Sequence, residues 1–199
     1  MRRARIEAQN EAMLRRQRDF RLAADVVTAA LMTFDEVEAI AVIGSVAKPL
    51  WKEVPRFREF RSARVKIWHE CADLDLAVWL SSLERLGSLR RARDRALRES
   101  FEAGVNPGVT GHQLDIFLFE AGTDRHLGRL CRFSTCPKGK PDCAVPGCGD
   151  IPFLRQIEGF RPRADLLEPA AQAMLFRRGS GLIRSALELP QPIDHDDLA

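Results

Sequence analysis

The chain contains three short apolar runs with the character of strands, separated by longer segments whose apolar side chains recur at helical spacing. Residues 37–43 are apolar except at Glu38 and end at Gly44, a pattern typical of a buried central strand. Residues 73–79 and 112–120 alternate between polar and apolar side chains, which predicts two further strands. The pattern therefore predicts a protein that combines strands and helices.

Helices are expected at both ends of the chain and between the second and third strands. Residues 2–21 are rich in Arg, Ala, Glu and Gln, which favour a helix; we expect a solvated helix there, the alternative being an electrostatic arm for RNA. Residues 22–33 continue it with an apolar surface nearly all round, so this part should be buried. Residues 81–84 (Ser-Ser-Leu-Glu) have the form of a capping box that opens a helix reaching Phe101. A short helix is expected over 164–178.

Three aspartates lie within these strands and carry the candidate chemistry. Asp73 and Asp75 project from the same face of one strand, while Leu74 and Leu76 project from the other. Asp115 lies in the middle of the next apolar run, where an unpaired charge is costly. Like charges at close range repel each other, and oxygen ligands of this kind suit Mg²⁺. The three carboxylates are therefore expected to converge on one metal site.

Gly44-Ser45 followed by Asp73, Asp75 and Asp115 resembles the small stand-alone nucleotidyltransferases of the DNA polymerase beta superfamily. The resemblance covers roughly residues 22–120. It implies an α/β (α+β) fold with a nucleotidyltransferase-type mixed sheet flanked by helices. The chain departs from the family because many more residues separate Ser45 from Asp73. We interpret residues 48–71 as an insertion.

The resemblance also implies an activity, namely metal-dependent transfer of a nucleoside monophosphate from a nucleoside triphosphate, with ATP as the expected donor. Asp73, Asp75 and Asp115 would hold Mg²⁺ or Mn²⁺, and Gly44 and Ser45 would bind the β- and γ-phosphates. The acceptor hydroxyl could belong to a small molecule, a protein or an RNA. The alternatives are a degenerate module of this fold that binds RNA or a protein partner, and a carboxylate-metal hydrolase.

The predicted insertion interleaves basic and aromatic residues, among them Trp51, Arg58, Phe60, Arg61 and Trp68. Flat apolar groups beside cations suit nucleic acids, or a nucleotide and an anionic acceptor. The alternative is a helical hairpin that buries its aromatic side chains and exposes its arginines. The sequence leaves both interpretations open.

Four cysteines crowd into a loop that is rich in proline and glycine: Cys131, Cys136, Cys143 and Cys148. Four thiolates on tight turns suit a tetrahedral Zn²⁺ ion, which can order a loop that has little apolar core. His126 could replace Cys131 in such a site, or the cysteines could simply be reduced thiols. Cys71 is remote in sequence and is expected to be a packed thiol.

The totals suit one globular core, since the chain has 199 residues, of which 45% are hydrophobic, and a net charge of +3. We expect a nucleotidyltransferase core over 1–123, a Cys-rich loop over 124–160, and a C-terminal helix with an acidic tail over 161–199. No apolar run approaches the ~20 residues that span a bilayer. The arginine-rich start lacks a secretory signal, and a cytoplasmic protein without a membrane partner is expected.

Overall fold

A seven-stranded mixed sheet forms the centre of the protein in a computed structural model that describes residues 3–105, 108–136, 143–163 and 165–192. In their order across the sheet the strands are β7 (Leu154–Arg155), β6 (His126–Leu130), β5 (Leu114–Glu120), β4 (Leu74–Leu80), β1 (Val37–Ile43), β8 (Gln172–Arg177) and β9 (Gly181–Leu182). Strands β4 and β5 run parallel, and the other neighbours are antiparallel. The expected combination of a mixed sheet with helices is confirmed.

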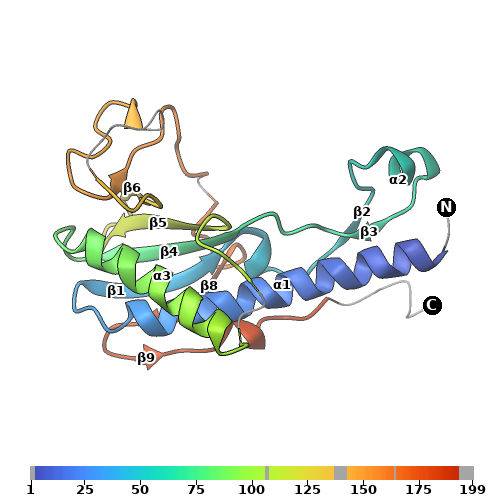
Figure 1. Cartoon of the computed structure of the whole chain (residues 1–199), viewed down its shortest axis with the longest axis horizontal. Coiled ribbons are helices and arrows are strands. Elements are labelled where there is room, and N and C mark those ends of the chain that lie inside the picture. The colour runs from blue at the N-terminus through green and yellow to red at the C-terminus, as the bar shows by residue number, and fades with distance from the viewer. Residues whose placement is uncertain (1–2, 106–107, 137–142, 164, 193–199) are drawn as a thin grey trace.

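Two helices, α1 (Arg3–Leu31) and α3 (Leu86–Glu102), cover one face of this sheet (Figure 1). The segments predicted as a solvated and a buried helix are a single helix of 29 residues. Its second half packs Phe20, Val27 and Leu31 into the main core, and its first half extends beyond the sheet (Figure 1).

Helix α3 begins later than predicted, at Leu86, and its first turn has no side-chain cap. The hydroxyl of Ser82 instead accepts a hydrogen bond from the backbone N–H of Glu84 at 3.2 Å. A serine that closes such a local turn is no longer available to cap a helix. The predicted capping box is therefore wrong, although the apolar stripe through Leu86 and Leu89 is buried as expected.

The insertion forms β2 (Lys52–Glu53), the short helix α2 (Arg58–Ala63) and β3 (Ile67–Trp68), so it is a small strand hairpin with a helix at its tip and not a helical hairpin. It packs on the projecting half of α1 through buried Phe60 and Trp68. The backbone N–H of Trp68 donates to Asn10 Oδ1 at 2.9 Å. The insertion therefore lies at the far end of α1, away from the segment around β6 and β7 (Figure 1).

The C-terminal segment corrects the prediction of a helix over 164–178. Residues 172–177 are strand β8, which pairs with the free side of β1. Ala, Met and Leu favour a helix in isolation, but pairing with a central strand overrides that local preference. The sheet continues through β9, and η3 (Ala186–Glu188) packs on α1. The predicted acidic tail with Asp194, Asp196 and Asp197 lies outside the described residues.

The second face of the sheet carries a smaller apolar cluster, built from Ala39, Ala41, Ile43, Ala77, Trp79, Phe117 and Phe119. Irregular chain between β7 and β8 covers it, because Phe160, Leu166 and Leu167 pack on this cluster. Strands from the segments predicted as a Cys-rich loop and as a C-terminal helix thus belong to the same sheet as β1, β4 and β5.

Among the described residues, no helix combines the length and the apolar character needed to cross a membrane.

Candidate active site

Asp75 and Asp115 lie side by side on the second face of the sheet. They are direct partners in the register between the parallel strands β4 and β5, and Ile43 at the end of β1 is the antiparallel partner of Asp75. Neighbouring strands are ~4.8 Å apart, so the two carboxylates are close neighbours. Asp73 lies exposed just before β4. Of the three carboxylates predicted to converge, the sheet register thus brings Asp75 and Asp115 together.

Gly44 meets this pair where β1 ends. Its φ of +73° falls in the region that side chains disfavour, and a Cβ at this position would lie 3.4 Å from Asp75 Oδ2. Residues Gly44–Ala47 form one turn of 3₁₀ helix (η1), as the expected change from strand to helix requires. The backbone at Gly44 can therefore approach a group held by Asp75 without obstruction.

The charge on Asp75 is unfavourable in the folded protein. Burial, with smaller contributions from Asp115 and Asp73, raises the pKa of this carboxyl to about 6, against an opposing effect of Arg129. A desolvated carboxylate beside two like charges is stabilised by a bound cation. The electrostatics of Asp75 therefore suit a metal ligand.

Arg129, on β6, belongs to the site although the sequence analysis did not single it out. Its Nη1 donates to Asp115 Oδ2 at 2.6 Å, and its guanidinium lies over the rings of Phe117 (4.1 Å) and Phe160 (4.6 Å). The aromatic rings hold the cation in place and shield the ion pair from water. The only sequence signal was a basic residue inside a short apolar run, which is weak by itself.

Two side chains of α1 hold the turn after Gly44 and were also not foreseen. Gln17 Nε2 donates to the carbonyl of Lys48 at 2.8 Å, and Arg21 donates to the carbonyls of Val46 and Lys48 at 3.1 Å each. Burial lowers the pKa of Arg21. These donors thus fix the carbonyl groups of the turn from the side of α1. Ser45 lies beside the buried thiol of Cys71, which confirms that Cys71 is packed.

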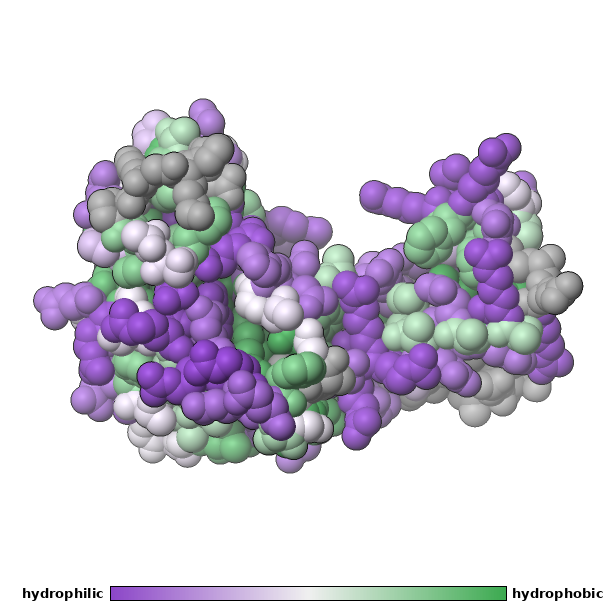
Figure 2. All heavy atoms as spheres, viewed as in Figure 1, coloured by the Kyte–Doolittle hydropathy of each residue, from purple (hydrophilic) through white to green (hydrophobic). Residues whose placement is uncertain are grey.

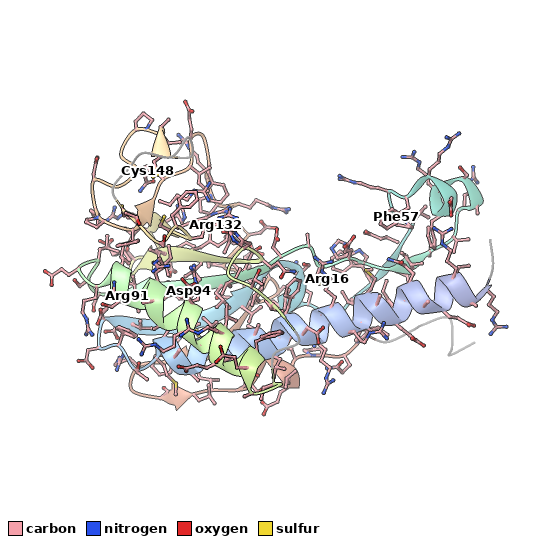
Figure 3. All side chains as sticks on the ribbon, viewed as in Figure 1. Arg16, Phe57, Arg91, Asp94, Arg132 and Cys148 are labelled. Atoms are coloured by element: carbon pink, nitrogen blue, oxygen red, sulfur yellow. The ribbon has the colours of Figure 1, made fainter. Side chains whose placement is uncertain are left out.

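The four cysteines of the predicted zinc site all lie in the segment between β6 and β7. Cys131 and Cys148 are buried, and the sulfur of Cys136 accepts a hydrogen bond from the backbone N–H of Phe153 at 3.2 Å. Burial raises the pKa of Cys131, and the other three thiols add to this effect, so all four are within electrostatic range. Figure 3 shows Cys148 at the opposite end of the molecule from Phe57 on the insertion.

His126 lies apart from these cysteines. Its ring packs with those of Phe117, Phe119 and Phe160 on the second face of the sheet, with centroids 5.5–6.1 Å apart. Burial lowers its pKa. Cys131 follows His126 by five positions along extended chain, which corresponds to ~16 Å. His126 therefore does not replace Cys131 in a zinc site.

Among the described residues, no three His, Cys, Asp or Glu side chains are already arranged around a point that could hold a metal ion. At the carboxylates, Asp73 lies outside the pair formed by Asp75 and Asp115, and Arg129 engages one oxygen of Asp115. Closure around a cation would accordingly require movement of these side chains.

Comparison of the chain with protein-family models, with curated proteins and with solved structures found no match.

Proposed function

We propose that the protein is a Mg²⁺-dependent nucleotidyltransferase that moves a nucleoside monophosphate from a nucleoside triphosphate to a hydroxyl acceptor. One observation carries the proposal: the register of β4 and β5 aligns Asp75 with Asp115 directly beside the open backbone of Gly44. Two adjacent carboxylates next to a glycine turn provide ligands for a cation and backbone donors for phosphates.

Each residue has a role in this reaction. Asp73 and Asp75 would hold Mg²⁺, and Gly44 and Ser45 would bind the β- and γ-phosphates through the backbone and the hydroxyl. When bound, the metal neutralises charge on the transferring phosphate. The acceptor oxygen forms a bond to the α-phosphorus while the bond to the bridging oxygen breaks and pyrophosphate leaves. Asp115 accepts the proton of the acceptor hydroxyl or completes a second metal position.

Arg129 adjusts the charge of the site. Its guanidinium donates a hydrogen bond to Asp115, while the charge on Asp75 stays unfavourable and would be stabilised by a bound cation. The two carboxylates therefore differ in environment, as their two proposed roles require.

Calorimetric titration with each nucleoside triphosphate, with and without Mg²⁺, tests this function. We expect Mg²⁺-dependent binding by the wild type that is lost in the double variant Asp73→Asn/Asp75→Asn, because neutral amides bind a hard cation poorly. Asp35→Asn is the matched control, since Asp35 is an exposed carboxylate in the turn before β1. A folded wild-type protein that binds none of the triphosphates would contradict the proposal.

The acceptor proposed for this site is a large anion bound by the insertion. The insertion begins three residues after Ser45 and ends two residues before Asp73, so it is anchored at both sides of the site. Phe57 is 51% exposed, and Trp51 stacks on His69 with centroids 4.0 Å apart. The same segment exposes five basic side chains: Arg56, Arg58, Arg61, Arg64 and Lys66. Figure 2 shows hydrophilic and hydrophobic residues mixed on the surface of the insertion, which a narrower part of the molecule separates from the sheet.

Charge reversal tests the insertion. Arg58→Glu/Arg61→Glu should weaken binding of a short single-stranded RNA by at least about tenfold in a fluorescence anisotropy titration, because phosphate contacts supply most of such affinity. The pair Arg91→Glu/Arg95→Glu on α3 makes the same change in net charge on another surface. If both double variants bind the RNA with the affinity of the wild type, the proposal that RNA is the acceptor is contradicted.

A binding module of the same fold is the second candidate, favoured by the ion pair that already occupies Asp115. It predicts RNA affinity that persists without Mg²⁺ and in the Asp73→Asn/Asp75→Asn variant, together with no binding of nucleoside triphosphates. The two titrations together therefore separate the enzyme from the module.

Zinc is proposed for the four-cysteine segment, held by Cys131, Cys136, Cys143 and Cys148. Support comes from the burial of two of these thiols and the mutual electrostatic effect on Cys131. We expect about one zinc per chain by elemental analysis of protein purified under reducing conditions. Cys136→Ser/Cys143→Ser should lose it, whereas Cys71→Ala, which removes a thiol outside the segment, should keep it. Zinc-free wild-type protein would contradict this assignment.

A further inference from the structure

A second candidate site lies on the opposite, helix-covered side of the sheet. A pocket of about 450 Å³ opens between α3 and the loop that leads into β5. Its lining includes Arg93, Asp94, Leu97 and Phe101 from α3, Val109 from the loop, and Arg132 from the chain after β6. Figure 3 shows Asp94 on α3 and Arg132 near the end of β6.

Arg93 is the unusual member of this lining because its side chain is only 1% exposed. Its Nε and Nη2 bond to Asp94 Oδ1 at 2.8 and 2.7 Å, but its Nη1 is buried and finds no hydrogen-bond acceptor among the residues that the structure describes. A Cβ at Gly111, another lining residue, would lie 3.7 Å from Arg93 Nη2, so the guanidinium borders the pocket wall. A buried donor without a partner is costly, and an acceptor supplied by a ligand would remove that cost.

The charge of the pocket favours an anion. Asp94 is shared between Arg93 and Arg90, whose Nη1 lies 2.6 Å from Asp94 Oδ2, so one carboxylate balances two guanidiniums. Arg132 adds a further positive charge and has no ion pair among the described residues. Guanidinium groups therefore outnumber carboxylates at this partly buried wall, and such a site attracts carboxylate or phosphate groups.

The remaining walls are apolar and suit the body of a small organic molecule. Leu97 and Val109 are buried, and Phe101 is 60% exposed at the rim. An exposed phenylalanine beside buried aliphatic groups is covered when an apolar ligand occupies the pocket. A volume of this size holds a ligand with one ring and a charged substituent.

We propose that this pocket binds a small organic anion, a carboxylate or a phosphate monoester carried on an apolar body. The charged group contacts Arg93 and Arg132, and the apolar body lies against Leu97, Val109 and Phe101. The site is independent of the proposed nucleotidyl transfer, because it lies on the opposite face of the sheet from Asp75 and Asp115.

Four probes separate the contributions in a calorimetric titration of the full chain: benzoate, phenyl phosphate, benzyl alcohol and inorganic phosphate. Benzoate or phenyl phosphate should bind, and the stronger of the two identifies the anionic group that the pocket prefers. Benzyl alcohol, which lacks the charge, and inorganic phosphate, which lacks the apolar body, should each bind at least about tenfold more weakly. Equal binding of benzyl alcohol, or no binding of either aromatic anion, would overturn the proposal.

Variants locate the binding. Arg132→Gln and Arg93→Gln should each weaken the preferred anion by about tenfold or more, and Phe101→Ala should weaken it without changing the preference between anions. Arg132 and Phe101 are not fully buried, so these two variants keep the test valid if Arg93→Gln fails to fold. Arg91→Gln is the matched control on α3. Wild-type affinity in Arg132→Gln and Phe101→Ala would overturn the proposal.

The titration is repeated with Asp73→Asn/Asp75→Asn. Unchanged affinity for the preferred anion is expected, and it would show a site separate from the carboxylates even if the protein transfers no nucleotide. Loss of affinity in this variant would place the anion at the carboxylate site and overturn the assignment.

Discussion

Asp75→Asn is expected to lower the rate of pyrophosphate release from a nucleoside triphosphate by at least about a thousandfold, which corresponds to ~4 kcal/mol of lost transition-state stabilisation. The reason is that Asp75 is a half-buried carboxylate placed next to both Asp115 and the open backbone of Gly44. The rate is measured by a coupled pyrophosphate assay once an acceptor has been found. Asp35→Asn should retain the wild-type rate. Turnover by Asp75→Asn at the wild-type rate would exclude the proposed reaction.

The same variant should be more stable than the wild type at high pH. This result would show that its loss of activity is not caused by unfolding. The pKa of Asp75 is about 6 in the folded protein against 3.8 as the ordinary value. The unfolded chain therefore ionises first, and the wild type loses stability as the pH rises from about 4 through 6.

Asparagine does not titrate, so at pH 8 Asp75→Asn should exceed the wild type by up to about 3 kcal/mol in the free energy of unfolding measured with urea. The difference should vanish near pH 3.5, where the carboxyl is largely protonated in both states. Added Mg²⁺ should narrow the gap at pH 8 by stabilising the wild type alone. A variant less stable than the wild type at pH 8 would show that Asp75 is structurally favourable.

Arg21→Met should lower the free energy of unfolding by about 3 kcal/mol, since several buried carbonyls lose their donor at once. Beyond the turn after Gly44, Arg21 donates to the carbonyls of Leu189 at 3.0 Å and Pro190 at 3.2 Å. It thereby joins α1 to the C-terminal segment. Urea unfolding measures the change. Arg18→Met, at an exposed position of the same helix, should change stability by less than about 0.5 kcal/mol.

If Arg21→Met and Arg18→Met are equally stable, the carbonyls must be satisfied by water and the bracing role of Arg21 is wrong. If Arg21→Met is destabilised, its nucleotide affinity should fall as well, because the turn that carries Ser45 has lost its support from α1.

The local pattern was sufficient for the elements that carry the carboxylates. Strands β1, β4 and β5 lie where apolar runs and alternation predicted them, and Asp75 projects opposite Leu74 and Leu76 as a period of two requires. Asp75 and Asp115 were predicted to be neighbours because an isolated charge inside an apolar strand is costly. That cost follows from the residue type and its immediate sequence context.

The local pattern failed where partners distant in sequence decide the structure. Residues 172–177 have the composition of a helix, yet they form a strand because they pair with the side of β1 that β4 leaves open. Arg129 meets Asp115 only because β6 folds back on β5. Arg21 meets four carbonyls from two segments that are far apart in the chain.

The sequence by itself thus determined strands β1, β4 and β5, the two main helices and the pair of aspartates, because burial and periodicity act within a few residues. The tertiary structure alone decided the strand order, the position of the insertion on α1, and the arginines that neutralise and brace the site. Those features depend on pairing and long-range hydrogen bonds, whose partners no local pattern identifies.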